Sequence, residues 1–71
     1  MSDGTRTKLA TITAPYDRHV RLEDVVFESG MRLLRVTIRE GHRITALDID
    51  AATATQWADT MREWVKQVAE R

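Results

Sequence analysis

The hydrophobic pattern of this chain changes its period once, near residue 50. Before that point, apolar and polar residues alternate in short runs, which is typical of half-buried β-strands. From residue 51 onward, apolar residues recur every three or four positions, which is typical of an amphipathic helix. The sequence therefore predicts several strands followed by one C-terminal helix.

Turn-forming residues divide the first part of the chain into four expected strands. The expected strands are residues 8–14, 19–28, 32–40 and 42–49, and the expected turns lie at Pro15–Asp17, Ser29–Gly30 and Gly41–His42. Residues 1–6 lack the alternation, so we expect a loose N-terminal tail followed by a single domain over residues 7–71.

The turn at Gly41–His42 predicts the register of the last hairpin. A two-residue turn with glycine in the first central position places Val36 opposite Leu47 on one face of the sheet. It places Arg35 opposite Asp48 on the other face, as a cross-strand pair of opposite charge. Turn chemistry and alternation thus agree for this hairpin.

The hairpin before it has two registers that fit the sequence. A two-residue loop puts Val25 and Phe27 on the face that bears Leu34. A three-residue loop puts Leu22 and Val26 there instead. The sequence leaves this choice open, because the second strand is apolar on both faces near its end.

The helix is expected to begin directly after the last strand. Asp50 is a natural N-cap, and Thr53 with Gln56 is an alternative capping box that would start the helix three residues later. The apolar stripe covers an arc of roughly 140°. Trp57 lies near the middle of that stripe and is expected in the core, whereas Trp64 lies at its edge.

These elements define the expected fold class, α+β. It is an antiparallel meander of three to four strands with one C-terminal amphipathic helix packed on one face. One helix cannot cover both faces of a sheet, so the other face is expected to stay open. That face is expected to carry Arg35, Arg39 and Ile44.

A chain of 71 residues and 8.2 kDa builds only a small core. Area scaling predicts a folded surface of roughly 4,500 Å². The free energy gained by burial and the cost of ordering the chain are then both on the order of 100 kcal/mol and nearly cancel. A second subunit or another partner would stabilise such a domain.

Composition argues against several chemistries. The chain has no cysteine, which excludes disulfides and thiolate metal sites. His19 and His42 lie on different elements without ligand spacing, and no phosphate-binding loop or nucleophile motif is present. We therefore expect no catalytic residues, no metal or other cofactor, and no enzymatic activity.

The charge balance argues against strong nonspecific binding to nucleic acid or to anionic lipid. Eleven basic residues stand against eleven acidic ones. No apolar run is long enough for a membrane span, and no signal segment opens the chain. Because small secreted domains usually carry disulfides, we expect a cytoplasmic protein without a membrane partner.

The order of elements resembles a known family over roughly residues 20–68. The residues that carry this pattern are Ile44 to Asp50, Trp57, Met61, Val65 and Val68. They resemble the single-strand-binding transcriptional coactivators of the positive-cofactor type, in which a curved sheet binds single-stranded DNA and the C-terminal helix dimerises. This chain lacks the lysine-rich strand loops of that family, since Lys8 and Lys66 are its only lysines. It is also similar to short proteobacterial proteins with no assigned function, which implies no activity.

The sequence thus favours a small non-enzymatic domain that acts through a protein interface, as a homodimer or as an accessory subunit. The residues expected at that interface are Trp64, Arg35, Arg39 and Ile44. The alternative, which the charge balance disfavours, is a dimer that binds single-stranded nucleic acid through an arginine-bearing sheet face. Its expected residues are Arg32, Arg35, Arg39 and Arg43.

Overall fold

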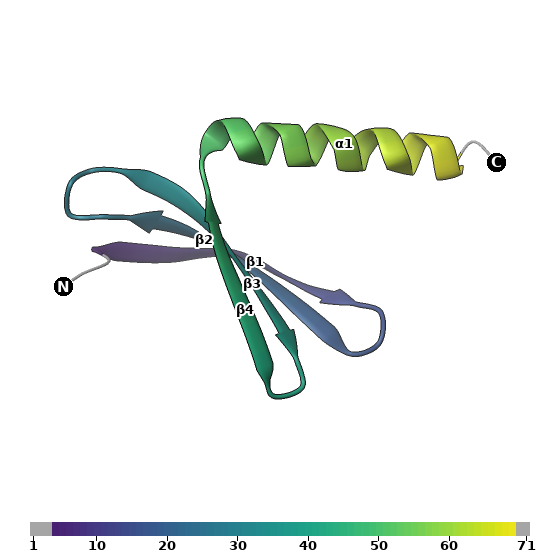
Figure 1. The fold of residues 1–71 in the computed structure, drawn as a ribbon, viewed down its shortest axis with the longest axis horizontal. Coiled ribbons are helices and arrows are strands. Elements are labelled where there is room, and N and C mark those ends of the chain that lie inside the picture. Colours follow the sequence, from purple (N-terminus) through teal and green to yellow (C-terminus); the bar gives the residue numbers. More distant parts are fainter. Residues whose placement is uncertain (1–3, 70–71) are drawn as a thin grey trace.

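A computed structural model describes residues 4–69 as one antiparallel sheet and one helix (Figure 1). The strands are β1 (Thr5–Ala14), β2 (Arg18–Val26), β3 (Arg32–Glu40) and β4 (Arg43–Ile49), in the spatial order β1-β2-β3-β4. The helix is α1 (Ala51–Ala69). The predicted α+β meander with a C-terminal helix is confirmed.

The β3–β4 hairpin has the predicted register. Val36 pairs with Leu47 and Arg35 with Asp48 across the two strands. Gly41 has a φ of 62°, which is the left-handed conformation that the first central position of the predicted turn requires. Local turn chemistry therefore determines which face each residue of β3 and β4 occupies.

The β2–β3 hairpin adopts the three-residue loop. The Gly30 amide donates to the Phe27 carbonyl, and the Phe27 amide donates to the Met31 carbonyl, both at 2.9 Å. Gly30 has a φ of 95°, as the last residue of such a loop requires. Leu22 consequently pairs with Val36 and lies on the same face of the sheet as Leu34.

Strand β1 begins earlier than the sequence predicts. Residues 1–6 are an expected tail, but Thr5 and Arg6 pair with Val26 and Val25 of β2 and belong to the strand. Residues 1–3 lie outside the described part of the chain. The register shifts between Lys8 and Ala10, so Leu9 is the extra residue of a β-bulge.

One residue joins the sheet to the helix. β4 ends at Ile49 and α1 begins at Ala51, so only Asp50 lies between them. The Asp50 side chain caps the helix, because its Oδ1 accepts a hydrogen bond of 2.9 Å from the Thr53 amide. The first of the two predicted helix starts is thus the observed one.

The helix lies on one side of the sheet but does not close onto it. α1 contacts the sheet chiefly at β3, and none of its described residues is buried. The expectation that Trp57 is a core residue is wrong, since Trp57 is 41% exposed. Figure 1 shows strand directions that turn progressively from β1 to β4, so one straight helix anchored at β4 follows only part of the twisted sheet.

The chain is more extended than its length requires. Its radius of gyration is 14.3 Å, against about 11 Å for a compact domain of this length. Its surface is 5922 Å², about 1,400 Å² more than the surface expected for its mass. The buried residues of the described chain are Val25, Val36 and Ile49. The fold therefore leaves apolar surface uncovered.

Replacing the helix cap should reveal how far α1 depends on Asp50. We expect Asp50→Ala to lower the free energy of unfolding, because the Thr53 amide loses its acceptor. Asp50→Asn should retain most of the stability, since an asparagine side chain also caps helices. Urea unfolding followed by circular dichroism measures both, and equal losses for the two variants would contradict the capping role.

Candidate interaction surfaces

An apolar cleft of about 410 Å³ lies between the sheet and the first half of α1. The residues that line this apolar cleft are Ile12, Val20, Leu22, Leu34, Val36, Ile49, Ala54, Trp57, Ala58 and Met61. They come from all four strands and from the helix, and none of them carries a charge. We call the sheet face that borders the cleft the near face, and the opposite face the far face.

The cleft is open because the helix diverges from the sheet. Val36 and Ile49 form its buried floor. Ile12 at one side is 49% exposed and Met61 on the helix is 61% exposed. The sides of the cleft are therefore an accessible apolar surface above a buried floor.

The apolar stripe of α1 continues beyond the cleft. Trp64, Val65 and Val68, which we call the C-terminal stripe, do not line the cleft. They lie on the same side of the helix as Trp57 and Met61, because they follow at three-, four- and seven-residue spacings. Trp64 is 62% exposed, so the predicted interface residue on the helix is accessible.

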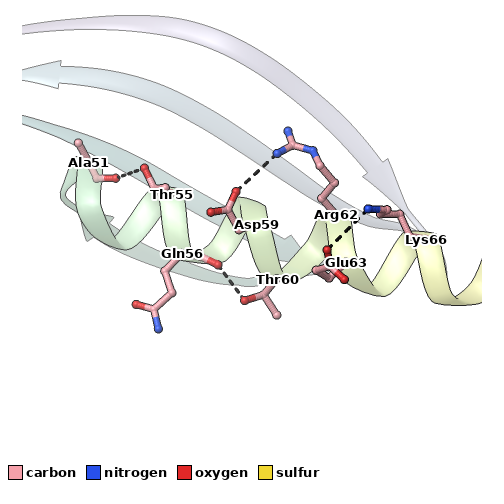
Figure 2. A network of polar contacts seen from close by, with 8 residues as sticks. All are labelled: Ala51, Thr55, Gln56, Asp59, Thr60, Arg62, Glu63 and Lys66. Atoms are coloured by element: carbon pink, nitrogen blue, oxygen red, sulfur yellow. Dashed lines mark hydrogen bonds and ion pairs between the residues drawn. The ribbon is translucent and has the colours of Figure 1, made fainter.

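The polar side of α1 forms its interactions within the helix (Figure 2). Arg62 pairs with Asp59 at 3.5 Å, and Lys66 pairs with Glu63 at 3.8 Å. The Thr60 hydroxyl donates to the Gln56 carbonyl at 2.8 Å. Exposed pairs of this kind stabilise a helix only slightly. They leave the apolar stripe as the side of α1 that gains most from a partner.

The far face carries a row of alternating charges across all four strands. Lys8, Glu23, Arg35 and Asp48 lie opposite one another in register. Arg35 donates two hydrogen bonds to Asp48, of 2.8 Å and 3.0 Å. The hydrogen bond from Arg35 is the main reason that the pKa of Asp48 lies below its usual value.

Three of the four predicted interface residues share the far face. Arg39 lies directly opposite Ile44, and Arg35 lies four residues before Arg39 on the same strand, which places both arginines on one face. Ile44 is 64% exposed. Trp64 does not join them, because the apolar stripe of the helix is directed to the near face. The predicted interface thus separates into two surfaces.

The four arginines predicted for nucleic-acid binding do not share one face. Arg35 and Arg39 lie on the far face, whereas Arg32 and Arg43 occupy near-face positions of the same hairpin. Arg32 donates to Asp24 on β2 at 3.0 Å. The physical reason is that successive side chains of a strand point to opposite faces, so Arg32 lies on the face opposite to Arg35 and Arg39.

The near-face residues of β1 and β2 were missed as functional residues by the sequence reasoning. These residues are Ile12, Val20 and Leu22, and none of them is among the interface candidates that the sequence predicts. One signal could have identified them, namely the single residue that separates β4 from α1. Such a short connection gives the helix little freedom to return across the sheet.

Within residues 4–69, no group of three or more potential ligand side chains is arranged to hold a metal ion. No helix of the same segment combines the length and apolar character needed to cross a membrane. The two neighbouring carboxylates near the end of β4 have structural partners, since Asp48 binds Arg35 and Asp50 caps α1.

The fold and its surfaces define a small α+β domain with an uncovered apolar side. The chain belongs to a family of unknown function, DUF6967, whose model matches residues 3–67. No curated protein and no solved structure matches this chain. The resemblance to the single-strand-binding coactivators therefore rests on the order of elements alone.

The Arg35–Asp48 pair should contribute to stability in a pH-dependent way. Asp48 has a lowered pKa in the folded state, so its contribution is complete above the unfolded pKa of about 3.9 and is lost as the pH falls through the folded pKa. At neutral pH we expect Asp48→Asn to lower the free energy of unfolding by about 1 kcal/mol.

Urea unfolding at neutral pH and near pH 3 measures this effect. The difference between the parent chain and Asp48→Asn should shrink at the lower pH, because the parent carboxylate is then increasingly protonated. Asp59→Asn is the matched control, since Asp59 is an exposed carboxylate of the helix. A difference that grows with acid would contradict the assignment.

Proposed function

We propose that this chain is a non-enzymatic protein-interaction domain that acts through self-association, with a role as an accessory subunit of another protein as the alternative. The observation that carries the proposal is the apolar surface formed by the cleft and the C-terminal stripe. Contiguous exposed apolar surface of this kind marks interaction sites in soluble proteins.

The residue types on this surface support the proposal. Trp57, Met61 and Trp64 extend along one side of the helix, and all three are exposed. Tryptophan and methionine are enriched in protein interfaces, and tryptophan is frequent among the residues that dominate binding energy. A cytoplasmic location belongs to the same proposal, on the argument from the absence of disulfides in a small domain.

The solution mass over a wide range of protein concentrations tests self-association. We expect a mass of twice 8.2 kDa that dissociates on dilution. We also expect a thermal midpoint that rises with protein concentration, because association stabilises the folded state by mass action. A monomeric mass at every concentration, with a constant midpoint, would contradict the proposal.

Truncating Trp64 should weaken the association. Loss of an interface tryptophan typically costs about 2 kcal/mol, so Trp64→Ala should raise the dissociation constant about 30-fold. Gln56→Ala on the polar side of α1 is the matched control and should leave the constant unchanged. Sedimentation equilibrium measures both constants, and circular dichroism checks that the variants fold. Equal constants for the two variants would contradict a role for Trp64.

A second candidate function is supported by the far face. Arg21 and Arg39 lie there without an acidic residue opposite them in register. Such a cationic sheet face could follow the backbone of a single-stranded nucleic acid. Within residues 4–69, the strands contribute no aromatic side chain to stack on the bases, because Tyr16 lies in the β1–β2 turn and Phe27 in the β2–β3 loop. We therefore rank this function below protein interaction.

The salt dependence of binding distinguishes the second candidate. A nucleic-acid-binding protein should bind a fluorescent single-stranded oligonucleotide at low salt and lose affinity steeply as salt is added. Arg39→Ala should then weaken binding, whereas Arg62→Ala on the helix should not. Negligible binding at low salt would eliminate this candidate and leave the protein interface.

A further inference from the structure

The whole-chain surface leaves room for a protein interface of standard size. The chain exposes about 1,400 Å² more than a compact chain of its mass. A standard protein interface buries about 800 Å² on each partner, and obligate homodimers bury more. The excess is therefore in the range that a stable protein dimer covers.

The apolar surface consists of a hollow and a ridge. The hollow is the apolar cleft, whose floor contains Val36 and Ile49. The ridge is the C-terminal stripe, which lies beyond the lining of the cleft and, by its helical spacing, on the same side of α1. Both surfaces are apolar and exposed, and the stripe cannot enter the cleft of its own chain, because the same continuous helix lines the cleft and carries the stripe.

A second copy of the chain supplies a stripe to fill the cleft and a cleft to receive the stripe. In a two-fold dimer, the same surface patches meet reciprocally, so each stripe can fill the cleft of the other chain. An insertion in one direction alone would leave one cleft and one stripe open. The two-fold arrangement is thus the smallest assembly that covers all of this apolar surface.

Charge does not oppose this arrangement. The cleft and the C-terminal stripe contain no ionisable side chain, so their contact buries no charge. On the polar side of α1, Asp59 with Arg62 and Glu63 with Lys66 balance each other. Two helices can therefore approach without net repulsion.

We infer that two copies of this chain exchange their C-terminal stripes, with Trp64, Val65 and Val68 of each copy packed into the apolar cleft of the other. This inference rests on the proposed self-association and specifies its geometry. Each core is then completed by the partner's helix, and the exposed Trp64 becomes buried only in the dimer.

Disulfide trapping tests this geometry, because the chain has no cysteine of its own. Val20→Cys places a thiol in the cleft, and Val65→Cys and Val68→Cys place thiols on the C-terminal stripe. Each variant is prepared alone, and the cleft variant is mixed with one stripe variant, unfolded, refolded and oxidised. Any disulfide between the two variants must then join different chains.

We expect a covalent heterodimer between the cleft variant and at least one stripe variant, since a disulfide requires Cα atoms roughly 4.4–6.8 Å apart. Gln56→Cys on the polar side of α1 is the matched control and should give no heterodimer with the cleft variant. Peptide mass spectrometry identifies the linked residues. A dimer in solution mass without any cleft-to-stripe disulfide would overturn the exchanged geometry and leave self-association standing.

The emission of Trp64 provides a readout that needs no cysteine. In a Trp57→Phe variant, Trp64 is the only tryptophan. Its emission should shift to shorter wavelength as the concentration rises through the dissociation constant, because the indole leaves water. A blue-shifted emission in a monomer would indicate that the helix closes onto its own sheet and would overturn the exchange. An emission that stays water-exposed in the dimer would overturn it as well.

Discussion

The junction between β4 and α1 is the constraint on which the rest of the structure depends. One residue, Asp50, connects the last strand to the helix and also caps it. The helix therefore starts at the end of an edge strand, with its direction determined by that strand. Because the sheet twists away from this line, the helix covers its beginning and leaves its remaining near face open. The cleft and the exposed stripe both follow from this geometry.

The fold was predictable where local chemistry and periodicity agree. The β3–β4 register followed from Gly41 and from the alternation of β3, and the helix start followed from Asp50. The β2–β3 register did not follow, because Val25, Val26 and Phe27 are apolar without alternation. Only the hydrogen bonds that close the loop at Gly30 select the observed register.

The candidate surfaces were predictable only in part. The alternation of side chains along a strand correctly placed Arg35, Arg39 and Ile44 on one face, because every second residue of a strand shares a face and hairpin partners lie opposite each other. The same alternation places Arg32 and Arg43 on the other face. The exposure of Trp57 was not predictable, because helical periodicity identifies which side of a helix is apolar and not what covers that side. That depends on the path of the chain between the two elements.

The bulge at Leu9 affects how this molecule can aggregate. β1 is an edge strand, and an exposed edge offers its backbone as a template for another chain. The extra residue between Lys8 and Ala10 shifts the hydrogen-bonding register between the two halves of that edge. A regular incoming strand could pair with one half or the other, but not with both. The sheet therefore resists fibril-like extension along this edge.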